Sequence, residues 1–164
     1  MTVAPKLQPL DIDSVTCFGR AIEKFQDVAL QQTENVFEQA GVLVPVRSCS
    51  LVLAIKTLDN PAATDLAQRL GYSHQLVLQK IPKLQKLGLI VATRDPDDAR
   101  RRMFALTDLG QTQAELLETV LPAFTVAYEQ LFAEIGDINA LMARALSAIE
   151  ARPLQERIQL PNRT

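Results

Sequence analysis

Apolar residues recur at helical spacing in two long stretches, one at each end of the chain. The first predicts a helix from Ser14 to about Gln39, ended by Gly41, and its apolar positions are Phe18, Ile22, Phe25, Ala29 and Val36. The second predicts a helix from Thr107 to about Ile135, with a kink at Pro122. Gly136 and Asp137 then stop that helix and cap a last one, which runs to about Glu150.

The middle of the chain carries shorter patterns with clear boundaries. Three helices are predicted at residues 46–58, 64–70 and 73–87, with Thr64 and Ser73 as caps and glycines at 71 and 88 as stops. Two β-prone runs, 89–94 and 101–106, flank a turn-forming Asp-Pro-Asp-Asp loop and predict a hairpin. The expected fold is therefore mainly α with one small β-hairpin.

The stretch from Leu66 to Val77 has the features of a helix-turn-helix. Ala67 is small enough for two helices to cross there, Gly71 tolerates the positive φ of the turn, and Val77 is an apolar wedge. In the second helix Val77, Ile81 and Leu84 share a face that should be buried, while Gln75, Gln79, Lys83 and Lys86 lie opposite.

Glutamine and lysine side chains on such a helix can read base edges or phosphates in a major groove. The candidate contacts here are Thr64, Ser73, His74, Gln75, Leu76, Gln79, Lys80 and Lys83. An ordinary helical hairpin with a solvated polar face is the alternative. Leucines near the groove side at 76 and 78 and a proline at 82, where we expect a bend, weaken the DNA-binding interpretation and favour an interaction module instead.

The predicted hairpin concentrates positive charge. Residues 61–107 hold eight basic and four acidic side chains, a net charge of +4, although the whole chain carries −2 and the remainder therefore −6. Arginines near the tip of a hairpin can enter a narrow minor groove, and the candidates are Arg94, Arg100, Arg101 and Arg102. A solvated charged turn is the alternative. It is less favoured here because the loop directly follows a helix-turn-helix.

The hairpin sequence is also similar to a known family. The run Asp95-Pro96-Asp97-Asp98-Ala99-Arg100, followed by Leu106-Thr107-Asp108-Leu109-Gly110, resembles the MarR-family pattern D-x-x-D-R-R followed by L-T-x-x-G. The helix order matches too, so the resemblance covers about residues 12–150. Ala99 departs from the pattern where many members carry the first arginine, so we expect Arg100 in the minor groove, with Arg102 as the alternative.

The resemblance implies a winged helix-turn-helix that binds double-stranded DNA as a homodimer on a pseudo-palindromic operator. The expected function is transcriptional regulation in the cytoplasm, with repression as the leading mode. The implied layout is an N-terminal arm (1–10), a dimerisation helix (11–45), the DNA-binding domain (46–107), further dimerisation helices (108–150) and a C-terminal tail (151–164). Surplus apolar positions on the terminal helices independently favour a dimer.

MarR-like regulators respond to small aromatic or anionic ligands or to oxidants. By topology a ligand site would fall near Arg20, Phe25, Arg47 and Ser48, and Cys17 resembles the sensor position of oxidant-responsive members. A packed structural cysteine is the alternative for Cys17, and Cys49 is expected in the core.

Other classes of function find little support in the sequence. It has no glycine-rich phosphate loop, no metal-type cysteine or histidine spacing, no secretory h-region and no membrane-length apolar run, so we expect no enzyme, no cofactor, no metal and no membrane partner. The serious alternative is a winged-helix protein–protein interaction module with weak or lost DNA binding, which the acidic total charge favours.

Overall fold

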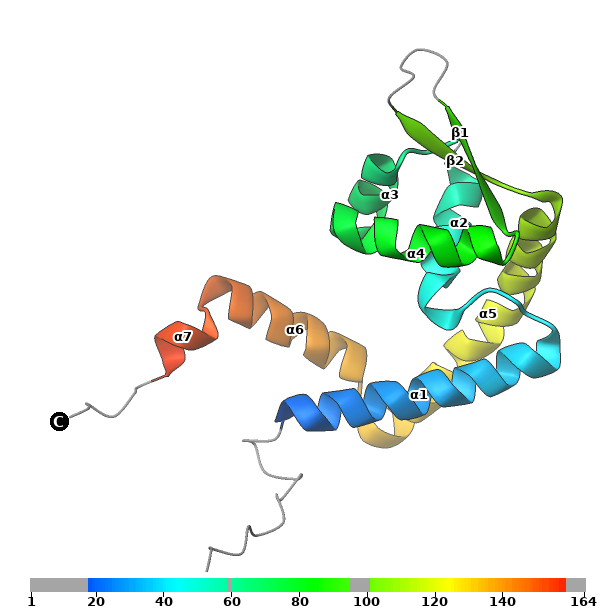
Figure 1. Ribbon diagram of the computed structural model, residues 1–164. Coiled ribbons are helices and arrows are strands. Elements are labelled where there is room, and N and C mark those ends of the chain that lie inside the picture. The colour runs from blue at the N-terminus through cyan, green and yellow to red at the C-terminus, as the bar shows by residue number, and fades with distance from the viewer. Residues whose placement is uncertain (1–17, 59, 95–100, 159–164) are drawn as a thin grey trace, which may run out of the picture. The chain divides into compact units, whose positions relative to one another are not determined.

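The computed structural model describes residues 18–58, 60–94 and 101–158, and within them it is mainly helical with one antiparallel hairpin (Figure 1). The elements are α1 (Phe18–Ala40), η2 (Val46–Ser48), α2 (Cys49–Thr57), α3 (Ala63–Leu70), α4 (His74–Lys86), β1 (Ile90–Arg94), β2 (Arg102–Leu106), α5 (Asp108–Ile135), α6 (Ile138–Ala151) and α7 (Leu154–Arg157). This confirms the predicted fold class and element order. The chain divides into two compact units, residues 1–119 and 120–164, with the division inside α5.

The predicted helix boundaries are largely confirmed. Gly41, Gly71 and Gly136 all adopt positive φ where a helix ends, a conformation that costs glycine little. Ser73 caps α4 by accepting a 3.1 Å hydrogen bond from the Leu76 N–H. Asp137 caps α6 in the same way, through the Ala140 N–H at 2.9 Å. These local signals are strong because each cap satisfies a backbone donor that the first turn leaves unpaired.

Two boundaries differ from expectation. Thr64 does not cap the third helix: Ala62 occupies the N-cap position, and Thr64 lies one residue inside α3. The Ala62 N–H instead donates 2.8 Å to a carboxylate oxygen of Asp65, so the acid at the third helical position fixes the start of the helix. The segment predicted as a tail contains α7, whose Arg157 donates to the carbonyls of Arg152 and Ala148 at 2.9 and 2.7 Å.

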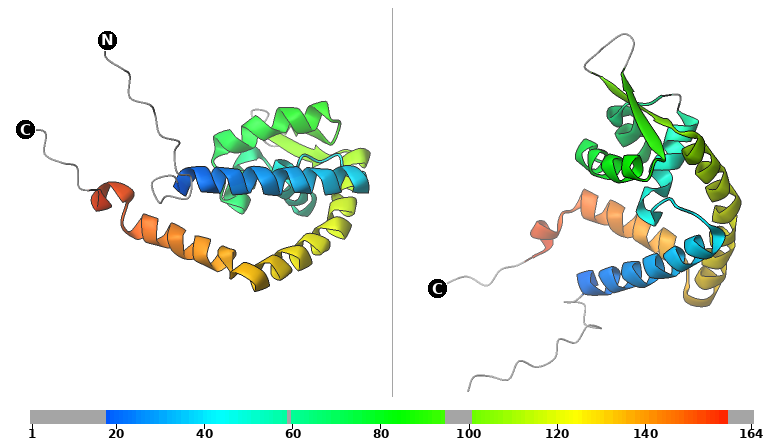
Figure 2. Two further views of the ribbon diagram at one scale, coloured as in Figure 1. Left: turned by 90° about the horizontal axis from the view of Figure 1, so that it is seen from below. Right: turned by 45° about the vertical axis from the view of Figure 1, so that its right-hand side comes forward.

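The hairpin rises from the cluster formed by α2, α3 and α4, and Figure 2 shows the same arrangement from two further sides. Its register pairs Ile90 with Leu106 at one end and Arg94 with Arg102 at the other. The loop before α3 joins the opposite edge of β2: the Phe104 N–H donates 2.9 Å to the Pro61 carbonyl, and Ala62 bridges to Met103. The hairpin is thus held by main-chain bonds as well as by packing.

The core of residues 18–119 is built from aliphatic side chains of every element in the helix-turn-helix. Leu51 and Val52 of α2, Leu66 of α3, and Val77 and Leu84 of α4 are inaccessible to solvent. Phe104 from β2 and Ile90 from β1 are also buried, as the predicted hydrophobic pattern requires. Cys49 is buried as well, its Sγ lying 3.7 Å from the Pro45 carbonyl oxygen, and this confirms its predicted core position.

The Leu-Thr-x-x-Gly run joins the hairpin to α5. The Thr107 hydroxyl donates 2.5 Å to the Gly88 carbonyl and accepts the Gly110 N–H at 3.0 Å, so Thr107 caps α5 as predicted. The Thr107 N–H donates 3.1 Å to the Leu89 carbonyl. Gly110 packs so closely on Leu89 that a Cβ added to it would lie 1.9 Å from that carbonyl oxygen. Both motif positions therefore have a geometric reason.

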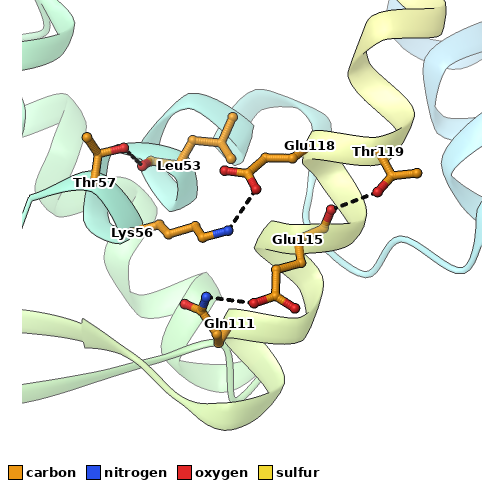
Figure 3. A network of polar contacts seen from close by, with 7 residues as sticks. All are labelled: Leu53, Lys56, Thr57, Gln111, Glu115, Glu118 and Thr119. Carbon is orange, nitrogen blue, oxygen red and sulfur yellow. Dashed lines mark hydrogen bonds and ion pairs between the residues drawn. The ribbon is translucent and has the colours of Figure 1, made fainter.

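Polar contacts fix the first part of α5 against the rest of its unit. Lys56 of α2 and Glu118 of α5 form a 2.7 Å ion pair, seen in Figure 3 beside the Gln111–Glu115 hydrogen bond. The buried Gln113 side chain accepts the Leu43 N–H at 2.6 Å and donates to the Gly41 carbonyl at 3.3 Å. Gln113 thus satisfies two backbone groups of the connection that follows α1.

The helices expected to dimerise expose most of their apolar side chains. In α1 only Phe37 is buried, and no described residue of 120–158 is. The exposed apolar residues are Phe18, Ile22, Phe25, Val28 and Val36 of α1, and Val126, Tyr128, Ile135, Leu141, Met142, Leu146, Ile149, Leu154 and Ile158 of the second unit. None of the helices in the described ranges is long and apolar enough to cross a bilayer.

Candidate nucleic-acid interface

Helix α4 separates a buried face from an exposed polar one. Val77, Ile81 and Leu84 are packed in the core, as predicted. The predicted contacts Ser73, His74, Gln75, Leu76, Gln79 and Lys83 are all exposed, and so is Lys86. Because the core fixes the rotation of the helix, the side chains of Gln75, Gln79 and Lys83 must face solvent. We call this exposed face of α4, together with the hairpin arginines 94, 101 and 102, the reading surface.

Lys80 is the exception among the predicted α4 contacts. It is half-buried, and its Nζ donates a hydrogen bond to the Arg47 carbonyl of η2. That bond directs the ammonium group toward the body of the domain. Burial raises the pKa of the nearby Cys49 thiol to about 11, with the Lys80 charge acting in the opposite direction. Through its hydrogen bond to the Arg47 carbonyl, Lys80 connects α4 to η2.

The two leucines that argued against a groove-facing helix are both partly exposed, Leu76 by 38% and Leu78 by 45%. Leu78 lines a groove of about 360 Å³ between α4 and β2, together with Pro82, Phe104, His74 and Arg102. Pro82 does not end the helix, which continues to Lys86. The groove therefore has apolar lining residues, Leu78 among them, and an arginine, Arg102, at its edge. It lies beside the reading surface.

The hairpin presents arginines, but they are not equivalent. Arg94 and Arg102 are exposed and directly opposite each other in the register. Arg101 forms a 2.7 Å ion pair with Asp65 of α3. Thr64, also exposed, lies beside that acid, with its hydroxyl 3.5 Å from the second carboxylate oxygen. Arg100, the arginine expected in the minor groove, lies outside the described residues.

Sequence reasoning missed Asp65, which both caps α3 and pairs with the hairpin. The capping role was detectable because an acid three residues after the N-cap is a helix-start signal. The ion pair was not, since 36 residues separate its members. A hydrogen bond between the hydroxyls of Ser50 and Tyr72, 3.1 Å apart, was missed for the same reason.

The residues suggested for an effector site are not brought together in a cavity that the structure describes. Arg20 and Phe25 are exposed on α1, where Arg20 lies 3.8 Å from Glu23. Arg47 is exposed and Ser48 is buried, both in η2. None of the four lines the groove beside α4 or the smaller cavity near Lys56 and Gln111. Cys17 lies outside the described residues.

Residues 44–101, which contain the helix-turn-helix and the first strand of the hairpin but not β2, match the sequence model of the MarR family. This part of the chain is therefore similar to the MarR family. A 95-residue stretch is also 32% identical to the uncharacterized HTH-type transcriptional regulator YvnA of Bacillus subtilis (strain 168). That alignment spans 57% of this chain and 60% of the relative.

Two solved structures share the fold over most of the chain. The PcaV transcriptional regulator of Streptomyces coelicolor, in complex with its natural ligand, superposes with a TM-score of 0.63 at 16% identity, covering 89% of this chain and 99% of that one. MepR of S. aureus, in complex with DNA, superposes with a TM-score of 0.61 at 18% identity, covering 82% and 96%. These two proteins are similar to the present chain in fold.

Proposed function

We propose that this chain is a transcriptional regulator that binds double-stranded DNA as a homodimer on a pseudo-palindromic operator. The observation that carries the proposal is the reading surface: an exposed face with Gln75, Gln79 and Lys83, fixed by a buried apolar face and flanked by exposed hairpin arginines. A helix of this width fits the major groove, where glutamine pairs with adenine and lysine with guanine or phosphate. The DNA complex of MepR, which shares the fold, supports this use of it.

The local charge supports the same proposal. A total charge of −2 disfavours contact with DNA, but residues 61–107 carry +4, and phosphate attraction depends on the face presented. Backbone N–H groups at the start of α4 add donors beside Ser73. Sequence preference would come from the glutamines, and phosphate affinity from Lys83, Lys86 and the hairpin arginines.

The apolar side chains that the single chain leaves exposed support the proposed dimer. α1 buries one of its 23 residues and α6 none of its 14, although both carry apolar side chains at helical spacing. A second copy of the chain would cover these faces and place two reading surfaces about one helical turn of DNA apart, roughly 10 bp. We further propose that the regulator acts as a repressor and that a small aromatic or anionic effector releases it, in line with the ligand complex of PcaV.

Selection of bound duplexes from a random pool tests the proposal. A half-site repeated in inverted orientation, with centres about 10 bp apart, is expected. On that operator a dimer that neutralises about eight phosphates should show a log–log salt slope of roughly −7. Absence of duplex binding tighter than millimolar at low salt would instead favour the interaction module, which exposed Leu76 also suits.

Paired variants locate the interface. Gln79→Ala should relax the preference at one base by about 1–3 kcal/mol, while Gln130→Ala, an exposed glutamine of α5, should not. Arg102→Ala should weaken binding and reduce the salt slope by about one, whereas Arg144→Ala on α6 removes the same charge outside the reading surface and should leave the slope unchanged. Equal effects of a variant and its control would place the interface elsewhere.

A further inference from the structure

Asp65 connects the helix-turn-helix to the hairpin through a single atom. Its Oδ2 accepts the Ala62 N–H at 2.8 Å and the Arg101 Nη2 at 2.7 Å. Ala62 is the N-cap of α3, and Arg101 immediately precedes β2. The Asp65 carboxylate therefore accepts one hydrogen bond at the start of α3 and another from the residue just before β2, which is distant in sequence.

This connection lies where the other attachments of the hairpin end. Main-chain contacts to the loop before α3 hold β2 at Phe104 and Met103. Beyond them, the last pair in the register is Arg94 with Arg102, and like charges directly opposite each other weaken strand pairing. The Asp65–Arg101 ion pair extends the attachment two residues past Met103, to the end of the hairpin where the two strands carry like charges.

The ion pair adds no direct attraction for DNA and little global stability. The negative charge of Asp65 beside the reading surface repels phosphate. By pairing with Arg101, Asp65 also neutralises one of the cations that would attract phosphate. Both side chains are well exposed, at 43% for Arg101 and 39% for Asp65, and ion pairs of that kind add little to stability. What the pair supplies is a fixed geometry between α3 and the loop end of the hairpin.

We propose that Asp65 is a positioning residue of the DNA interface. By holding Arg101 it fixes the hairpin relative to α3 and α4, so that Arg94 and Arg102 meet the DNA backbone in register with the helix. This inference rests on the proposed function for its consequence, but the anchoring itself is a property of the free protein. The two parts can be tested separately.

The first measurement is amide hydrogen exchange in the free protein. Asp65→Asn keeps an oxygen that can accept the Ala62 N–H and removes the charge, and Arg101→Gln removes the same pair from the other side. Both should speed exchange at residues 92–94 and 101–103 at least about fivefold by local opening and leave α3 unchanged. Arg101→Lys, which can keep the pair, should remain near wild type. Unchanged exchange at the hairpin in both variants would overturn the proposal.

The second measurement is affinity for the selected operator and hydroxyl-radical protection of its flanks. If Asp65 positions the hairpin, Asp65→Asn and Arg101→Gln each weaken specific binding, by about tenfold, and reduce flank protection. The double variant should then be no worse than either single one. If Asp65 only repels phosphate, Asp65→Asn tightens binding while Arg101→Gln weakens it, and the proposal fails. A wild-type chain that binds no duplex would refute the proposed function, while the exchange result would still decide the anchor.

Discussion

Replacing Gly110 with alanine should destabilise the protein, because the added carbon meets backbone. An ideal Cβ at Gly110 would lie 1.9 Å from the Leu89 carbonyl oxygen and 2.9 Å from its carbon, far inside contact distance. The Leu89 carbonyl also accepts the Thr107 N–H at 3.1 Å, and the Leu89 N–H donates 3.0 Å to Leu84, so this segment is held on both sides. Either α5 or the start of β1 must shift to make room.

The size of the effect follows from three contributions. Overpacking of a buried position costs typically about 1–3 kcal/mol, and the upper end applies because no flexible side chain can move away. Weakening the Thr107–Leu89 hydrogen bond adds about 1 kcal/mol. Alanine regains up to about 1 kcal/mol as the better helix former. The net loss in the free energy of unfolding is about 2–3 kcal/mol.

Urea unfolding followed by circular dichroism measures this loss. The matched control is Gly19→Ala in α1, where an added Cβ meets nothing within 4 Å, so that variant should be as stable as wild type or gain up to about 1 kcal/mol. Opposite signs for the same substitution in two helices would support the packing argument. A Gly110→Ala protein as stable as wild type would refute it.

Three further predictions follow from local contacts. Gln113→Leu should lower the free energy of unfolding by about 1–3 kcal/mol, because it leaves the Leu43 N–H without its 2.6 Å acceptor. The control Gln111→Leu, at an exposed position of the same helix, should change that free energy little. Equal losses in the two variants would contradict this account. Ser73→Ala should cost about 1 kcal/mol through loss of the α4 cap, and Ser73→Asp should restore it, as thermal unfolding can show. In a Cys17→Ser background, Cys49 should react with iodoacetamide about 100-fold more slowly in the folded than in the unfolded protein, because folding raises the pKa of its thiol from 9.0 to about 11. For the same reason the free energy of unfolding should decline as the pH rises from 9 toward 11. Rapid labelling of the folded protein would contradict the buried position of Cys49.

Local chemistry in the sequence determined the elements and most of their ends. Gly71 and Gly136 could be recognised because glycine adopts positive φ at little cost, and Ser73 and Asp137 because a short polar side chain satisfies a free N–H. Helical periodicity likewise determined which face of α4 is buried, since Val77, Ile81 and Leu84 recur at that period. The same rules gave a wrong start for α3. They predict Thr64 as the N-cap, but the N-cap is Ala62, two residues earlier, because the Asp65 carboxylate accepts the Ala62 N–H.

Only the tertiary structure decided which cations remain available and why Gly110 is glycine. Asp65 and Arg101 are 36 residues apart, and Lys80 and the Arg47 carbonyl are 33 apart; no local rule relates them. Both basic side chains were predicted to contact DNA, yet each makes a contact within the domain that depends on how the hairpin and η2 pack on α3 and α4. The closeness of Gly110 to Leu89 is likewise a property of packing, because the contact joins the start of α5 to a residue 21 positions earlier. Such long-range contacts form only when the core is assembled, so they cannot be predicted from the periodicity of a single segment.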